Sequence, residues 1–206
     1  MKNKLAFRDY YKRRLPHIQI AGATYFITFR LANSLPKEAL DKLAQEKRKI
    51  IELPDTQKES THRAWFALYD DYLDKVLYGD LYLKNEQIAN VVAEAIQFRD
   101  GKVYDLISYC IMLNHVHLVC TPLEKMAGMY YGLTEILHSL KRHTAREANK
   151  ILQRNGAFWQ DESYDHFIRD DAELERIVKY VLYNPVKANL VKEQTNWKLS
   201  YCKYKI

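Results

Sequence analysis

The stretch IMLNHVHLVC, residues 111–120, constrains the fold of this 206-residue chain more than any other feature. Its valine and leucine residues favour a β-strand, and side chains along a strand point alternately to two faces. We therefore expect His115 and His117 on one face of a sheet, with Val116 and Leu118 on the other. The apolar strand pattern alone does not explain two neighbouring imidazoles. Either they are structural histidines with satisfied ring nitrogens, or they hold a metal ion.

The rest of the chain predicts an α+β fold in which helices pack against an antiparallel sheet. Alternating apolar and β-branched residues indicate strands, and apolar residues three or four apart indicate helices. The boundaries follow from capping and turn residues. The expected strands cover residues 23–32, 102–113 and 115–121, and the expected helices cover residues 36–53, 85–100, about 129–152, and a last one from Asp170 or Asp171 to an end near YNPVKANLV, residues 183–191.

One segment does not follow these patterns. Residues 54–63 are polar and lack a period, which predicts a loop, and residues 65–84 have no assigned structure. The sequence shows no internal repeat, low-complexity segment or clear linker. We therefore expect a single domain over residues 1–206, with an insertion around residues 54–84.

Composition limits the location and the partners of the protein. No apolar stretch approaches the ~20 residues of a membrane helix, and the N-terminal residues lack the apolar segment of a secretory signal. The three cysteines lie far apart and have no metal-type spacing, which favours reduced thiols. The net charge of +6 and the 16 tyrosines permit a polyanionic partner whose bases stack on aromatic rings. We expect a cytoplasmic, nucleoid-associated protein without membrane contact.

The last predicted helix carries a tyrosine and an amide on one flank. With a step of ~100° per residue, Tyr180 lies about 120° from Leu174, away from the apolar stripe, and Asn184 follows one turn later on the same flank. A phenol with its ordinary pKa of ~10 is a weak nucleophile and needs activation. Two histidines, an amide and a tyrosine could form a metal-assisted site for attack on a phosphodiester.

Longer motifs occur in the order found in a known family. They are YFITFRLANSLP, YLKNEQIANVVAEAI, IMLNHVHLV, HSLKRHTAREAN, FWQDESYDHFIRDDAELERIVKYVLYNPVKANLV and NWKLSY. The chain resembles the REP-associated tyrosine transposases, relatives of the single-tyrosine insertion-sequence transposases within the HUH endonuclease superfamily. It departs from their pattern at Leu113, where proline is frequent, and at Asn189, where glycine is usual. Asparagine tolerates the left-handed conformation, so we expect the turn after the last helix to persist.

The resemblance implies a ferredoxin-like HUH endonuclease domain with a C-terminal catalytic helix and tail. His115 and His117 would bind Mg²⁺ or Mn²⁺, which accept imidazole, water and hard oxygen ligands. We expect Asn184 to be the third protein ligand, because the family uses a polar residue at this offset from the tyrosine. The alternative is that Asn184 caps the helix end and does not meet the metal.

The resemblance also implies the reaction and the substrate. Tyr180, rather than Tyr164 or Tyr183, would attack one DNA strand, leaving a 5′-phosphotyrosine link and a free 3′-hydroxyl. The substrate would be single-stranded DNA next to imperfect palindromic hairpins. No external energy source is needed, because the link preserves the bond energy for rejoining. A monomer and a homodimer are both compatible with the family, as is action of the tyrosine within its own subunit or on a partner's site.

Basic residues are the expected contacts to DNA phosphates, which would make binding sensitive to salt. They are Arg13, Arg14, Lys141, Arg142 and Arg146, of which the last three could instead form a solvated helix face. Two other functions stay open at this point. One is a catalytically silent protein that binds DNA or RNA hairpins on the same fold. The other is a zinc hydrolase that shares the His-x-His strand, although it lacks a third His or Cys at familiar spacing.

Overall fold

The computed structural model of the chain describes residues 7–12, 16–75 and 78–204, and its centre is an antiparallel sheet of five strands. The strand order is β8-β3-β5-β4-β9. The strands are β3 (Thr24–Arg30), β4 (Tyr104–Ile111), β5 (His115–Pro122), β8 (Tyr164–Ile168) and β9 (Ser200–Cys202). The predicted α+β, ferredoxin-like class is confirmed.

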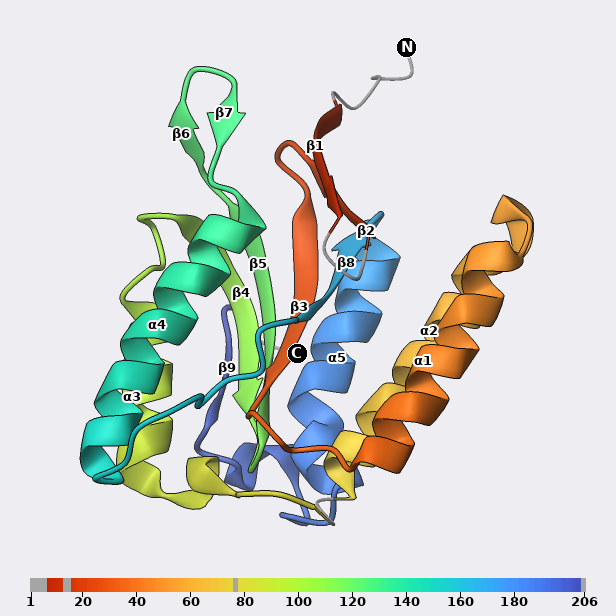
Figure 1. The fold of residues 1–206 in the computed structure, drawn as a ribbon. Coiled ribbons are helices and arrows are strands. Elements are labelled where there is room, and N and C mark those ends of the chain that lie inside the picture. Colours follow the sequence, from red (N-terminus) through yellow and green to blue (C-terminus); the bar gives the residue numbers. More distant parts are fainter. Residues whose placement is uncertain (1–6, 13–15, 76–77, 205–206) are drawn as a thin grey trace.

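Helices cover both faces of the sheet (Figure 1). On one face lie α3 (Glu86–Gln97) and α4 (Leu133–Ile151). On the other lie α1 (Lys37–Glu52), α2 (Asp55–Asp74) and α5 (Asp171–Lys187). Two short 3₁₀ turns, Tyr82–Lys84 and Gln194–Asn196, join these elements. Each face has its own apolar core, so the sheet is buried on both sides.

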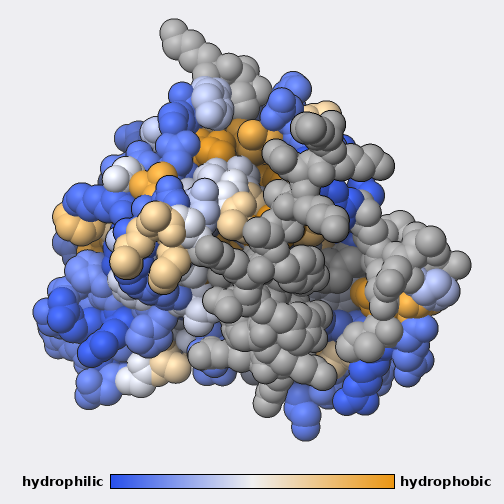
Figure 2. Space-filling view, turned by 90° about the horizontal axis from the view of Figure 1, so that it is seen from above, coloured by the Kyte–Doolittle hydropathy of each residue, from blue (hydrophilic) through white to orange (hydrophobic). Residues whose placement is uncertain are grey.

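Two small hairpins lie outside the central sheet. They consist of β1 (Phe7–Lys12) with β2 (Pro16–Ile20), and of β6 (Glu124–Met126) with β7 (Met129–Tyr130). The end of the molecule from which β6 and β7 project shows mostly hydrophilic residues around smaller hydrophobic areas (Figure 2). Met126, Met129 and Tyr130 are exposed there. Among the described residues, no helix is long and apolar enough to cross a membrane.

The long helix starts later than its predicted start near residue 129. Met129 and Tyr130 pair with β6, and Gly132 occupies the N-cap position of α4. Gly128 makes this hairpin possible, because its φ of +71° is rarely adopted by residues with a side chain. The predicted inner stripe of the helix is buried as expected and comprises Leu133, Ile136, Leu137, Leu140 and Thr144.

The prediction of a loop over residues 54–63 is wrong. Pro54 is the N-cap of α2, which is one continuous helix as far as Asp74. Trp65 and Leu73 are buried on the face that packs toward α1 and the sheet, and Trp65 Nε1 donates to the carbonyl of Leu43 at 2.8 Å. Tertiary packing of these apolar residues therefore overrides the weak local pattern of the polar half.

The last helix ends at Lys187, within the predicted end region of residues 183–191, and it contains Pro185. The turn after it closes with hydrogen bonds from Leu190 N to Pro185 O at 2.8 Å and from Asn189 N to Val186 O at 2.9 Å. This pair of bonds is the Schellman pattern, which needs a left-handed residue. Asn189 has a φ of +57°, so the expected left-handed turn is confirmed.

Candidate active site

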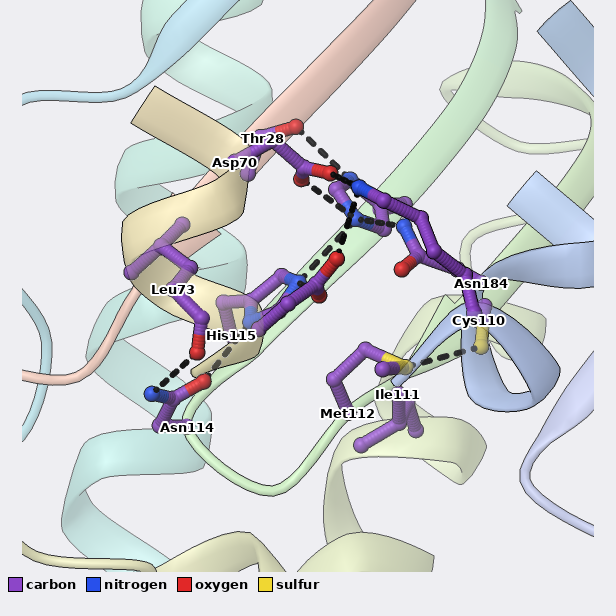
Figure 3. A network of polar contacts seen from close by, with 12 residues as sticks. Thr28, Asp70, Leu73, Cys110, Ile111, Met112, Asn114, His115 and Asn184 are labelled. Atoms are coloured by element: carbon purple, nitrogen blue, oxygen red, sulfur yellow. Dashed lines mark hydrogen bonds and ion pairs between the residues drawn. The ribbon is translucent and has the colours of Figure 1, made fainter. Parts of the chain in front are cut away.

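The two histidines of β5 face α2 and α5, and their side chains meet in a fully buried polar cluster (Figure 3). Nε2 of His115 lies 3.0 Å from Nε2 of His117. α2 contributes Asp70 and α5 contributes Asn184, and both side chains are 0% exposed. The structure therefore brings together residues that are more than 100 positions apart in the sequence.

Hydrogen bonds behind the rings set the orientation of the histidines. Nδ2 of Asn114 donates to the carbonyl of Leu73 at 3.1 Å, which leaves its Oδ1 facing Nδ1 of His115 at 2.7 Å. An amide oxygen only accepts, so Nδ1 of His115 carries the hydrogen and Nε2 keeps its lone pair. Burial, and then the charge of His117, lowers the pKa of His115 well below its usual value, which favours the neutral ring. Thr28 Oγ1 lies 2.8 Å from Nδ1 of His117 and can accept or donate there.

The Asn184 amide points into the same cluster. One of its terminal atoms lies 2.7 Å from Nε2 of His117. That atom is assigned as the oxygen, because the nitrogen then lies 3.1 and 3.3 Å from the two carboxylate oxygens of Asp74, which only accept. Asn184 lies inside α5 and its side chain does not cap the helix end. Its amide oxygen is a hard metal-ligand atom and lies beside the imidazoles.

Asp70 is the residue of this cluster that the sequence did not predict. Its Oδ1 is buried without a hydrogen-bond donor and lies 3.3 Å from Nε2 of His117. Its Oδ2 accepts from the Tyr180 hydroxyl and, at 2.8 Å, from Nζ of Lys187. Burial alone would raise the pKa of Asp70, but His117, His115 and Lys187 outweigh it and hold this pKa well below its usual range.

These atoms fit a divalent cation. Four atoms with lone pairs lie close together: Nε2 of His115, Nε2 of His117, the amide oxygen of Asn184 and Oδ1 of Asp70. Of these four atoms, Nε2 of His117 is the one that can carry a hydrogen. The ligand atoms of Asp70 and the two histidines lie within 4.8 Å of one another. Two ligands about 2.1 Å from one ion and at right angles lie about 3.0 Å apart, which matches the separation of the two ring nitrogens.

The charges of the site also favour a cation. Lys187 Nζ lies 2.8 Å from both Asp70 Oδ2 and Asp74 Oδ2, so two carboxylates share one ammonium. Burial and the charge of Asp70 raise the pKa of Asp74 to about 6, which still leaves it mainly ionised at neutral pH. A divalent ion and one phosphodiester would bring the sum of these charges to zero.

Tyr180 is held with its hydroxyl in the cluster. Its ring lies edge-on to Phe26 and Phe66, with centroids 6.0 and 6.3 Å away, and 5.7 Å from the ring of His117. Burial, and then the negative charge of Asp70, raises the pKa of Tyr180 far above its usual value, so the hydroxyl keeps its proton in this state.

The two other tyrosines that could serve as nucleophile lie elsewhere. Tyr183 is 56% exposed, one turn along α5 on its outer side. Tyr164 is buried in β8 and stacks on Phe66 with centroids 4.3 Å apart. Of the three, Tyr180 is the one whose hydroxyl contacts Asp70 of the cluster.

Comparison with known proteins places the chain in a family. Residues 66–184, more than half of the chain, match the family described as transposase IS200 like. The chain belongs to this family. A Haemophilus influenzae protein named as a REP-associated tyrosine transposase is 30% identical over an alignment of 103 residues, and the match covers 47% of this chain and 58% of that relative. The chain thus spans a little over half the length of that curated relative.

A solved structure has the same fold as this chain. It is described as a REP-associated tyrosine transposase bound to a REP hairpin. The match has a TM-score of 0.51 at 16% identity and covers 94% of this chain and 82% of that one. At this identity the likeness establishes the fold alone. The predicted resemblance and fold class are both confirmed.

The basic residues expected to contact DNA do not lie at the cluster. Arg142 and Arg146 are exposed on α4, across the sheet from the histidines. Lys141 Nζ donates to the carbonyls of Gln160 and Asp161 at 2.9 and 3.0 Å and to Ser163 Oγ at 2.6 Å, so it anchors the segment before β8. Arg13 and Arg14 lie outside the described residues.

Sequence reasoning missed Asp70, Asp74 and Lys187 of this site. Asp70 and Asp74 are four residues apart, on a helix that was not recognised. The signal was the spacing of Trp65 and Leu73, which places one apolar face on a helix and both aspartates beside it.

Proposed function

We propose that this IS200-like transposase nicks and transfers single-stranded DNA at palindromic hairpin elements, through a 5′-phosphotyrosine intermediate and with a divalent metal ion. The observation that carries the proposal is the contact of the Tyr180 hydroxyl with a buried cluster that contains His115 and His117. Membership of the transposase family supports the reaction class. The solved relative bound to a REP hairpin supports a hairpin substrate.

In this reaction the Tyr180 oxygen forms a bond to phosphorus, and the bond from phosphorus to the 3′ oxygen breaks. The tyrosine loses its hydroxyl proton and the 3′ oxygen gains one, so one phosphodiester replaces another. Because the bond energy is kept, the 3′-hydroxyl can attack the link and rejoin the strand. Bound at His115, His117 and Asn184, Mg²⁺ or Mn²⁺ would accept charge from a non-bridging oxygen and orient the scissile bond.

The residues around Tyr180 prepare it for this role. Phe26 and Phe66 restrict its ring, and Asp70 fixes the direction of its hydroxyl. Holding a nucleophile in one geometry removes orientational freedom before the reaction begins. The Tyr180 hydroxyl reaches Asp70 of its own chain, which supports action of Tyr180 within its own subunit.

The hairpin stem is proposed to bind on α4. Arg142 lines a groove of about 340 Å³ between α4 and residues 156–163, together with His138 and Trp159. Arg142 and Arg146 are the proposed phosphate contacts on α4, and Arg13 and Arg14, which lie outside the described residues, are proposed as further contacts. In this arrangement the stem and the cut lie on opposite faces of the sheet. The single-stranded part of the substrate therefore has to pass an edge of the sheet.

The test uses an end-labelled hairpin oligonucleotide with single-stranded flanks, Mg²⁺, and the full chain. We expect a covalent protein–DNA product, identified on a denaturing gel and mapped to Tyr180 by mass spectrometry. His115→Ala and His117→Ala should abolish this product and leave hairpin binding largely intact. A link on Tyr164 or Tyr183 would refute the nucleophile.

Other outcomes select other functions. Hairpin binding without a covalent product would indicate a silent binding protein. Metal-dependent hydrolysis without a protein–DNA link would indicate a hydrolase. Cleavage at the wild-type rate by either alanine variant in the presence of EDTA would show that the metal assignment is wrong.

A further inference from the structure

We infer that Asp70 of α2 links the metal ion to the nucleophile, because one oxygen of its carboxylate binds the ion while the other holds the hydroxyl of Tyr180. The inference rests on the proposed function and extends its metal site to α2. It adds a carboxylate to the two histidines and Asn184, and it gives that carboxylate a second, positioning role.

The first half of the inference concerns Oδ1. This oxygen is buried and accepts no hydrogen bond in the structure, and its nearest nitrogen is Nε2 of His117, an ion-pair partner at 3.3 Å. Buried polar atoms without a partner are rare in folded proteins, and many of those that occur belong to catalytic or ion-binding sites. Carboxylate oxygen is also the ligand that Mg²⁺ and Mn²⁺ prefer. Oδ1 is therefore the remaining protein ligand of the site.

The second half concerns Oδ2, which is fully used. It accepts from the Tyr180 hydroxyl and from Nζ of Lys187, the latter at 2.8 Å. The two donors come from one helix, α5, and both restrict the same carboxylate. A ligand that is held by hydrogen bonds to its second oxygen has a fixed direction toward the metal. The same bond sets where the nucleophilic oxygen lies relative to the ion.

Asp74, one turn later on α2, is a carboxylate that neither binds the metal ion nor holds the Tyr180 hydroxyl. Its oxygens face Lys187 Nζ at 2.8 Å and the Asn184 amide nitrogen at 3.1 Å, and the nearest distance to His115 Nε2 is 4.0 Å. Asp74 therefore orients Lys187 and the amide ligand, and it is a positioning residue. Two aspartates at this spacing repel each other on a helix, and the shared ammonium and the ion relieve that repulsion.

The link has a thermodynamic consequence. A metal ion at Oδ1 and a hydroxyl donor at Oδ2 both interact with the charge of one carboxylate. The binding of each therefore weakens the binding of the other. Removing the hydroxyl should therefore tighten metal binding, and by reciprocity metal binding should loosen the hold on Tyr180. Loading the ion would then release the hydroxyl toward the phosphate.

The first experiment measures Mn²⁺ affinity of the full chain by calorimetry, in the wild type and in Asp70→Asn. We expect the variant to bind Mn²⁺ about tenfold more weakly or worse, because it loses a charged ligand. Asp71→Asn is the matched control, since Asp71 is the next residue of the same helix, faces solvent and pairs with Lys75. The visible spectrum of bound Co²⁺, which reports coordination, should change in Asp70→Asn and stay the same in Asp71→Asn.

The second experiment leaves Asp70 intact and so does not depend on the folding of its variant. Tyr180→Phe should bind Mn²⁺ a few-fold more tightly than the wild type. Tyr183→Phe, an exposed tyrosine on the same helix, should bind it with wild-type affinity. In an Asp70→Asn background the effect of Tyr180→Phe should disappear, because the shared carboxylate is gone.

The outcomes distinguish a failure of this inference from a failure of the proposed function. A wild type that binds neither Mn²⁺ nor Co²⁺ would overturn the metal-dependent reaction itself. Mn²⁺ binding by the wild type that is the same in Asp70→Asn and Asp71→Asn would overturn the Asp70 ligand and leave the reaction standing. Equal Mn²⁺ affinities in Tyr180→Phe and Tyr183→Phe would overturn the link.

Discussion

The two faces of the central sheet draw on alternate residues of the same strands, β3 and β5. Ile27 lies opposite Leu118, and both belong to the apolar core beneath α3 and α4. The next pair, Thr28 and His117, points the other way, where His117 meets Asp70 of α2. A shift of one residue along a strand thus separates a packing position from a site position.

The faces also differ in how they treat buried polar atoms. Thr144 beneath α4 is satisfied, because it accepts from Trp159 Nε1 and donates to the carbonyl of Leu140, both at 2.8 Å. On the other face Oδ1 of Asp70 accepts no hydrogen bond and lies beside His117; the second such buried oxygen among the described residues, Oδ1 of Asn149, lies near the end of α4. Functional sites are where sequences depart from what folding alone would favour. The unsatisfied oxygen of Asp70 differs from that of Asn149 because it lies between the histidines and Tyr180, where the proposed chemistry would use it.

The largest effect that separates the faces is expected for Tyr180→Phe. The variant removes the proposed nucleophilic oxygen, so covalent product should fall by about 10⁴-fold or more, equivalent to about 5 kcal/mol. Packing of the ring on Phe26 and Phe66 is retained, so the melting temperature should stay close to that of the wild type. Gel assays of the labelled hairpin, with Tyr183→Phe as control, measure this. More than a trace of covalent adduct in Tyr180→Phe would contradict the assignment of Tyr180 as the nucleophile.

The next effect concerns the neighbouring position on the other face. Leu118→Ala deletes a fully buried side chain, so unfolding free energy should fall by about 2–5 kcal/mol. His117→Ala should lose Mn²⁺ binding instead. Urea denaturation and calorimetry on both variants test whether the two faces are separable. Loss of Mn²⁺ affinity in folded Leu118→Ala would show that the apolar face also shapes the site.

Local patterns were enough for much of this fold, and long-range packing explains the rest. Period two placed both histidines of β5 on one face, and helical spacing placed Tyr180 and Asn184 on one flank of α5. Asp70 was not predicted as a site residue, because its helix begins in a polar stretch whose helical structure depends on packing against α1 and the sheet. The anchoring bonds of Lys141 were also beyond local patterns, because its acceptors, the carbonyls of Gln160 and Asp161 and Oγ of Ser163, lie 19 to 22 residues away.

The third effect concerns Lys47 of α1, which lies in the outer layer of the site face with Nζ 4.8 Å from the ring centroid of Trp65. Burial lowers the pKa of Lys47 from 10.5 to about 8. Between these values the unfolded chain binds more protons than the folded one, so wild-type stability rises with pH across this window. Below about pH 8 the full penalty of the buried charge is present.

Lys47→Met should therefore stabilise the protein at pH 7 by about 1–2 kcal/mol, after allowance for partial exposure of the ammonium. The gain should shrink as the pH rises from about 8 toward 10.5. Urea denaturation at both ends of the window measures it. Lys49→Met is the control, because Lys49 is a 68% exposed side chain on the same helix. An equal gain for both variants at every pH would exclude burial as the cause.

The smallest effect tests whether the apolar face also carries the hairpin on its outer surface. Arg142→Ala with Arg146→Ala should weaken binding of every hairpin by about tenfold, or ~1.4 kcal/mol, without changing the preferred bases. The dependence of affinity on salt between ~50 and ~200 mM should become less steep, because fewer counterions are released. The control removes equal charge from the site side, as Arg176→Ala with Lys179→Ala on the solvent-facing side of α5. If the control weakens binding and the α4 variant does not, the stem lies on the same face as the cut, and the division of binding and chemistry between the two faces fails.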